Sequence, residues 1–106
     1  MPNIQQILNS SNYDSVRSIL EIAGALGEKK EIEVYVVGGF VRDLLMGSPI
    51  NDIDLMTVGE GIPFAEMLAS ELGRKKIVPF KKFGTALIPG NEIQIEVATA
   101  RKENYE

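Results

Sequence analysis

Apolar side chains recur every three or four residues in two stretches of the chain, the spacing of one buried face of a helix. The first stretch, residues 13–26, predicts an amphipathic helix that ends at Gly27, with the charged residues 28–31 as a solvated connection. The second stretch covers residues 63–72 and is followed by a glycine. A shorter apolar segment, residues 40–46, predicts a third helix, which a glycine and a proline close.

Five other segments are rich in β-branched residues or alternate between apolar and polar positions, as strands do. They are residues 32–37, 51–58, 76–80, 83–88 and 92–98. The last two flank Pro89-Gly90-Asn91, which is typical of a hairpin turn. The order helix, strand, helix, strand, helix and then several strands indicates an α/β (α+β) fold: a mixed β-sheet of about five strands with helices packed against it.

Composition excludes several classes of chemistry. The 106 residues suffice for one domain and contain no Cys and no His. Disulfides, thiolate nucleophiles, serine-histidine triads and metal sites built from sulfur or imidazole are therefore excluded. Any metal must be bound by oxygen ligands, which favours Mg²⁺, Mn²⁺ or Ca²⁺.

Charge and hydropathy set further limits. Eleven Lys and Arg against fifteen Asp and Glu give a net charge of −4, which argues against a domain that holds nucleic acid by charge alone. No apolar run is long enough to span a bilayer, and residues 1–11 are unlike a signal peptide. We therefore expect a cytoplasmic protein with no membrane partner.

Asp52 and Asp54 are two residues apart in a predicted strand, so their side chains share one face, with Cα atoms about 6.6 Å apart. Two such carboxylates repel each other unless a cation lies between them. A pair of this kind can bind one or two Mg²⁺ ions for an in-line phosphoryl displacement; a solvated strand face is the alternative. Glu96 alternates with apolar residues in the last predicted strand, and it would join the same polar face if that strand joined the same sheet.

Gly38 and Gly39 interrupt the chain between a predicted strand and a predicted helix. Glycines at this place let the backbone approach a ligand, and the first N–H groups of the following helix are free to bind phosphate. Arg42 can bind two phosphate oxygens at once through its guanidinium, and Asp43 follows it. The alternatives are a tight turn without a ligand and a surface ion pair between Arg42 and Asp43.

Two basic clusters flank a predicted strand, at residues 74–76 (Arg-Lys-Lys) and 81–82 (Lys-Lys). They could contact a phosphate backbone or a triphosphate. Lysines that protect a sheet edge from pairing with another chain are the favoured interpretation. An edge strand left open could instead pair two chains as a homodimer.

Two motifs are more specific together than either is alone: VVGGFVRDLLMG at residues 36–47 and NDIDL at residues 51–55. Together they resemble the head domain of the class II tRNA nucleotidyltransferase (CCA-adding enzyme) and bacterial poly(A) polymerase family, which belongs to the polymerase-β-like nucleotidyltransferase superfamily. The segments FGTA, residues 83–86, and IEVATARKE, residues 95–103, are similar to strand segments of the same family. The resemblance covers residues 32–105.

The resemblance implies a role for each candidate residue and one reaction. The implied nucleotide-binding residues are Gly38, Gly39, Arg42 and Asp43, and the implied catalytic residues are Asp52, Asp54 and Glu96, of which the two aspartates bind Mg²⁺ or Mn²⁺. The three acids are expected to converge in one cleft opposite the glycines. The reaction is template-independent transfer of a nucleotide from ATP or CTP to the 3′-hydroxyl of an RNA such as tRNA, with release of pyrophosphate.

Family members continue into an Arg-Arg-Asp motif and an all-helical neck, body and tail, which grip the RNA and select the base. Residues 1–106 are accordingly expected to be a truncated head domain with weak or no turnover of its own. The nucleotide added and the RNA used stay open.

Two other functions fit the same residues. One is a stand-alone minimal nucleotidyltransferase with a non-RNA acceptor, although such enzymes usually carry Gly-Ser in place of Gly38-Gly39. The other is a non-catalytic nucleotide-binding or interaction module in which the aspartate pair is a remnant. Mg²⁺-dependent ATP binding that is lost in Asp52→Ala would favour a catalytic lineage over the module.

Overall fold

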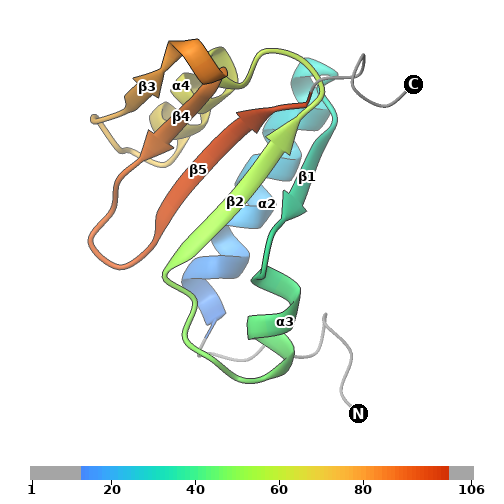
Figure 1. Ribbon diagram of the computed structural model, residues 1–106, viewed down its shortest axis with the longest axis vertical. Coiled ribbons are helices and arrows are strands. Elements are labelled where there is room, and N and C mark those ends of the chain that lie inside the picture. Colours follow the sequence, from blue (N-terminus) through green and yellow to red (C-terminus); the bar gives the residue numbers. More distant parts are fainter. Residues whose placement is uncertain (1–12, 101–106) are drawn as a thin grey trace.

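The computed structural model describes residues 13–100 of the chain, and these residues form one five-stranded sheet with helices (Figure 1). In chain order the elements are α2 (Asp14–Lys30), β1 (Val34–Val37), α3 (Phe40–Leu45), β2 (Asp52–Thr57), α4 (Gly61–Glu71), β3 (Val78–Phe80), the 3₁₀ turn η2 (Lys81–Phe83), β4 (Thr85–Ile88) and β5 (Gln94–Thr99). The strand order is β1-β2-β5-β4-β3. β2 and β5 are parallel and the other neighbours are antiparallel. The expected mixed sheet is therefore confirmed.

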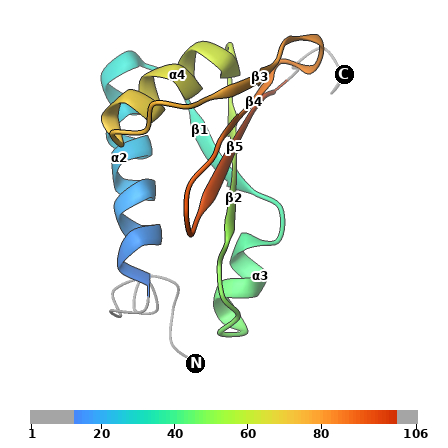
Figure 2. The same cartoon turned by 90° about the vertical axis from the view of Figure 1, so that its left-hand side faces the viewer.

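The sheet has one face covered by helices and one open face (Figure 2). α2 and α4 pack on the covered face, where Ile53 and Leu55 of β2 and Ile95 and Val97 of β5 are at most 1% exposed. Phe64 of α4 is fully buried in the same core. Because successive side chains of a strand point to opposite faces, the residues that alternate with these four point to the open face.

α2 continues past Gly27, so the predicted helix end was wrong, and residues 28–30 form its last turn instead of a solvated connection. The helix ends at Lys30, and its C-cap residue, Glu31, is left-handed with a φ of 58°. Gly27 serves another purpose, since a Cβ on it would lie 2.8 Å from the Ile32 carbonyl oxygen and 2.8 Å from a methyl of Val34. Its missing side chain lets the chain turn closely from the helix into β1.

The predicted strands at residues 76–80 and 83–88 were too long, because β3 begins at Val78 and β4 at Thr85. Between them η2 makes a tight turn, and Gly84 follows it with a φ of +64°. That left-handed conformation is one that glycine adopts readily, and it interrupts the extended backbone that the sequence pattern predicted. The remaining elements differ from the predicted ranges by one or two residues at their ends.

Thr99, at the end of β5, joins three elements. Its hydroxyl donates a hydrogen bond to the carbonyl of Gly84 (2.7 Å) and accepts one from the backbone N–H of Gly61 (2.8 Å). α4 begins at Gly61, two residues before the predicted start. The first N–H groups of a helix lack partners within the helix, and the Thr99 hydroxyl accepts a hydrogen bond from one of them.

Within residues 13–100, no helix combines the length and the apolar character that a bilayer span needs. Residues 1–11, which were compared with a signal peptide, lie outside the described residues. The same holds for residues 101–105, the end of the stretch that resembles the nucleotidyltransferase family.

Candidate functional site

Three candidate residues lie on the open face of the sheet. Along β2, Ile53 is fully buried, whereas Asp52 is exposed and Asp54 is half-buried. β5 runs parallel to β2 with Glu96 directly beside Asp54, and neighbours paired in this way point to the same side of a sheet. The parallel pairing of the two strands therefore brings all three carboxylates to one face.

The three carboxylates line one hollow of about 340 Å³. Its lining residues are Asp52, Asp54, Leu87, Gln94 and Glu96. Leu87 of β4 is the register partner of Glu96 and forms an apolar wall. One small ligand in this hollow can thus be reached by acidic side chains from two strands.

Gly38 lies against the carboxylate of Asp54. Val37, the last residue of β1, is the antiparallel partner of Asp54, and Gly38 follows with a φ of +80°. A Cβ on Gly38 would be only 2.9 Å from Oδ2 of Asp54. Two reasons therefore favour glycine here: the left-handed backbone and the space that the carboxylate occupies. Sequence reasoning missed the second reason, because it did not predict the pairing of β1 with β2.

Gly39, Arg42 and Asp43 form a second group next to the first. Gly39 is the N-cap of α3, and its carbonyl accepts a hydrogen bond from the Asp43 N–H (2.9 Å). Nε of Arg42 is 3.5 Å from Oδ1 of Asp43, and the Arg42 side chain is 74% exposed. Arg42 and Asp43 therefore form a surface ion pair, and the phosphate-binding role of Arg42 stays a prediction. The residues lining the acidic hollow include neither this pair nor the two glycines.

The oxygen donors of the hollow suit a hard divalent cation that arrives together with phosphate. Among residues 13–100, no three Asp, Glu, Cys or His side chains are arranged to hold a metal ion by themselves. Mg²⁺ in proteins is commonly bound by one or two carboxylates, and phosphate oxygens and water complete its octahedron. Asp52 and Asp54 fit that requirement as an oxygen-only pair, and Glu96 offers a further oxygen beside Asp54.

A larger hollow, of about 630 Å³, lies between the start of α2 and the hairpin that joins β4 to β5. Arg74 lines it and donates hydrogen bonds to the carbonyls of Ile93 (2.9 Å) and Pro89 (3.4 Å). Its guanidinium thus holds the hairpin in place. Sequence reasoning grouped Arg74 with the basic clusters, because no local signal connects it to a hairpin so far along the chain. We place the candidate site at the smaller, acidic hollow.

Comparison with known proteins connects this arrangement to one family. The family model described as the Poly A polymerase head domain matches residues 34–106. That range contains every candidate site residue. The A-adding tRNA nucleotidyltransferase of Geobacter sulfurreducens is 43% identical over 90 residues, which are 84% of this chain and 10% of that protein.

Two solved structures share the fold. A CCA-adding enzyme in complex with ATP matches with a TM-score of 0.83 and 34% identity, over 97% of this chain and 25% of that one. A tRNA nucleotidyltransferase complexed with a primer tRNA and an incoming ATP analog matches with a TM-score of 0.68 and 37% identity, over 79% of this chain and 24% of that one. The chain therefore spans between 10% and 25% of the length of these proteins.

Proposed function

The chain belongs to the poly(A) polymerase head-domain family, and from this premise we propose that it is the catalytic head domain of an RNA nucleotidyltransferase. The nucleotide donor is ATP or CTP, and the acceptor is the 3′-hydroxyl of an RNA, with tRNA as the proposed substrate. The proposed location is the cytoplasm. Because the chain spans 10% to 25% of the length of its relatives, we do not assign strong RNA binding or base selection to it.

One observation carries the proposal: Asp54 has Glu96 on one side and Gly38 on the other. An acid row alone would also suit a solvated strand face. A left-handed glycine whose Cβ position lies 2.9 Å from one of those carboxylates lets the backbone lie directly against the acid, with no side chain between them. Acids next to open backbone are what an anionic, metal-bound triphosphate requires.

The chain's own residues have distinct tasks in the transfer. The 3′ oxygen of the acceptor forms a bond to the α-phosphorus of the nucleotide while the bond from that phosphorus to the departing pyrophosphate breaks. Gly38 and Gly39 admit the triphosphate beside Asp54. Glu96 is exposed and lies next to Asp54, so we assign it to accept the proton of the acceptor hydroxyl.

Asp52 and Asp54 are the residues that would hold Mg²⁺ or Mn²⁺. When bound, such an ion neutralises charge on the phosphates and lowers the pKa of the attacking hydroxyl. Without a cation, the two carboxylates and the triphosphate are all negatively charged and repel one another. Nucleotide binding is therefore expected to require the cation.

The test is calorimetric titration of the full chain with a non-hydrolysable ATP analogue, with Mg²⁺ and with EDTA. We expect binding only with Mg²⁺, and a loss of about tenfold or more in affinity in Asp54→Asn. Glu66→Gln, which neutralises an exposed carboxylate on α4, is the matched control and should bind as the wild type does.

Equal binding with and without Mg²⁺, or unchanged binding in Asp54→Asn, would favour the non-catalytic module and contradict the proposal. Circular dichroism of each variant separates a lost site from a lost fold. The same titration with a CTP analogue defines the donor.

A further inference from the structure

One segment of this acidic chain is strongly basic. Residues 72–91 contain five of the eleven Lys and Arg residues and no Asp or Glu. In the structure this segment forms the edge strand β3, the turn η2 and the strand β4. A local positive excess on a chain whose net charge is −4 marks a surface that attracts polyanions.

Four of these five basic side chains are exposed and available for a ligand. Arg74 is engaged with the β4–β5 hairpin. The other four, Lys75, Lys76, Lys81 and Lys82, are exposed. Within residues 13–100 the ion pairs are Arg17–Asp14 and Arg42–Asp43, so none of the four lysines forms an ion pair with a described carboxylate.

Protection of the sheet edge does not account for these lysines. β3 has only three residues, and the middle one is Pro79. A short edge strand with a proline already resists pairing with another chain. The lysines stand before and after the strand, not within it.

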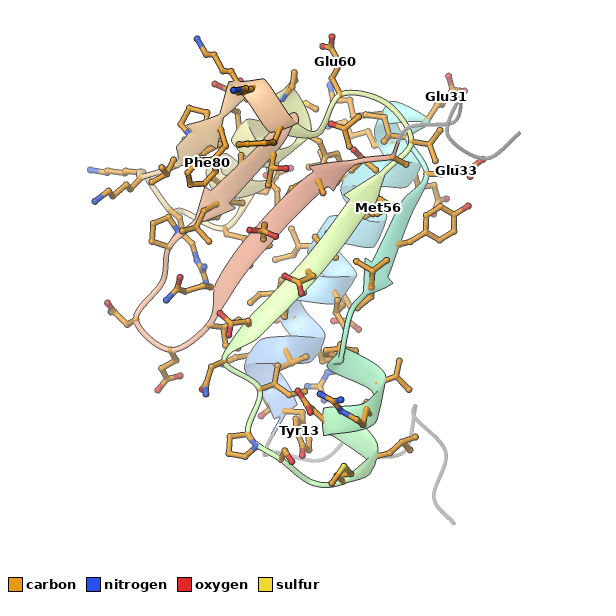
Figure 3. All side chains as sticks on the ribbon, in the orientation of Figure 1. Tyr13, Glu31, Glu33, Met56, Glu60 and Phe80 are labelled. Atoms are coloured by element: carbon orange, nitrogen blue, oxygen red, sulfur yellow. The ribbon has the colours of Figure 1, made fainter. Side chains whose placement is uncertain are left out.

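Two exposed aromatic residues accompany the lysines. Phe80 is 44% exposed and Phe83 is 64% exposed. Phe80 pairs with Thr85, Thr85 with Ala98, and Ala98 with Met56. This row crosses the open face of the sheet, and Figure 3 labels its two ends, Phe80 and Met56. Large apolar side chains exposed among lysines would weaken an edge whose purpose was to stay unpaired.

The row from Phe80 to Met56 lies next to the two acids of β2 and β5. Met56 and Ala98 are each two residues beyond Asp54 and Glu96 in their strands. With strands about 4.8 Å apart and a rise of about 3.3 Å per residue, the Cα of Phe80 is about 12 Å from that of Glu96 and about 16 Å from that of Asp54. A few nucleotides of a single strand span such a distance.

We propose that this surface, called the basic edge, binds single-stranded RNA just upstream of the 3′ end that reacts at the acidic hollow. The basic edge consists of Lys75, Lys76, Phe80, Lys81, Lys82 and Phe83. Its lysines bind phosphates, and its phenylalanines stack on unpaired bases, the combination by which proteins bind single strands. The inference rests on the proposed function for the identity of the acceptor. An acidic protein would match the lysines but would leave the phenylalanines without a role.

The test is fluorescence anisotropy of a labelled single-stranded oligoadenylate RNA of about 12 nucleotides, long enough for most single-domain sites. The full chain is titrated into it over a range of salt concentrations. EDTA is present and nucleotide is absent, so the acidic hollow does not contribute. The Lys81→Gln/Lys82→Gln double variant is compared with Lys29→Gln/Lys30→Gln, an exposed lysine pair in the last turn of α2. Phe83→Ser is compared with Tyr35→Ser, an aromatic residue that is 50% exposed on β1.

Single strands release about 0.7 counterions per neutralised phosphate. Because Lys81→Gln/Lys82→Gln removes two phosphate contacts, the slope of the logarithm of the association constant against the logarithm of the salt concentration should become about 1.4 less steep. Phe83→Ser should weaken binding by about tenfold. Both control variants should bind as the wild type does, and duplex RNA should compete poorly because its bases are stacked.

Three results would overturn the inference: no RNA binding by the wild-type chain at low salt, equal losses in the control variants, or binding of polyglutamate in place of RNA. Asp54→Asn should leave this RNA binding intact. If RNA binding fails while Mg²⁺-dependent nucleotide binding persists, the basic edge is wrong and the proposed function stands. If nucleotide binding fails while RNA binding persists, the proposed function is wrong and the basic edge still binds RNA.

Discussion

The acidic hollow and the basic edge lie on one sheet but are built differently. The acids stand on β2 and β5, central strands whose alternate residues, such as Ile53 and Ile95, are fully buried. The lysines and phenylalanines of the basic edge lie at the ends of a three-residue edge strand and in the turn η2. Groups that perform chemistry must be held within fractions of an ångström, whereas charge and stacking tolerate movement. The molecule places each kind of group accordingly.

The net charge of −4 conceals this division. It argues against electrostatic binding of nucleic acid only if charge is spread evenly, and here five of the basic residues lie within residues 72–91. Opposite local charges, one at the edge of the sheet and one on its open face, suit a substrate whose phosphates need lysines at one point and a cation held by acids at another.

We expect the largest effect from a change in the hydrophobic core, which supports both regions. Phe64 of α4 is fully buried, and Phe64→Ala should lower the free energy of unfolding by about 3–5 kcal/mol. With a total stability near the lower end of the usual range of about 5–15 kcal/mol, that loss unfolds an appreciable fraction of the chain and so weakens nucleotide and RNA binding together. Urea denaturation followed by both titrations checks it. The exposed Phe83→Ala is the control for the denaturation alone, because Phe83 belongs to the basic edge. Loss of only one binding activity would show that the regions do not depend on a common core.

A substitution at Gly38 should disturb the acidic hollow alone. Gly38 and Gly47 have φ values of +80° and +70°, but only Gly38 has a side chain, that of Asp54, within reach of an added Cβ. Gly38→Ala and Gly47→Ala should therefore each destabilise the fold by about 1 kcal/mol. Only Gly38→Ala should displace Asp54 and weaken Mg²⁺-dependent nucleotide binding, by about tenfold. Equal nucleotide affinities in the two variants would refute the positioning role of Gly38.

A substitution at Thr99 should disturb the basic edge alone. Thr99→Val keeps the shape of the side chain but removes the hydroxyl that bonds to Gly84 and Gly61. Its cost should be about 1–3 kcal/mol, because a partly buried carbonyl and N–H lose their partner. Loosening of η2 should weaken RNA binding and spare nucleotide binding. Thr85→Val, which removes only an exposed bond of 3.3 Å, is the control, and an equal loss of stability in it would contradict the account.

The smallest expected effect lies at the far edge of the sheet. The Tyr35 hydroxyl donates a hydrogen bond of 2.5 Å to the Glu33 carboxylate, and this bond, with the negative charge of Glu33, raises the pKa of Tyr35 above its ordinary 10.0. Because the folded-state pKa exceeds the unfolded one, the small stabilisation is present below pH 10 and disappears as pH rises through the folded value. Ultraviolet titration of Glu33→Gln should show Tyr35 ionising at lower pH than in the wild type, with Tyr35→Phe identifying its signal. An unchanged titration curve would disprove the contact.

Sequence patterns predicted the parts of this fold that depend on local periodicity. Alternation in residues 51–58 predicted which side of β2 is buried, and therefore that Asp52 and Asp54 share a face. The position of Glu96 beside Asp54 depends on the parallel pairing of β2 with β5. The pattern predicted this position only for the case that the two strands join the same sheet. The two central strands were thus predictable separately, and their pairing was not.

The errors and omissions have a common physical cause, which is contact between distant segments. Gly27 resembles a helix end, yet it lies within a helix, where its missing side chain leaves room for Val34. Arg74 resembles part of a basic cluster, yet it is engaged by Ile93. Thr99 carries no local signal for its bond to Gly84. Tertiary contacts override local preference at each of these positions.

The most direct test of the central claim is paramagnetic line broadening in the NMR spectrum of the labelled chain, with trace Mn²⁺ and a non-hydrolysable ATP analogue. We expect the amide signals of Asp52, Asp54, Glu96 and Gly38 to broaden first, and Asp54→Asn to abolish this selectivity. Broadening centred on other carboxylates, such as those of α4, with these four amides unaffected, would contradict the account.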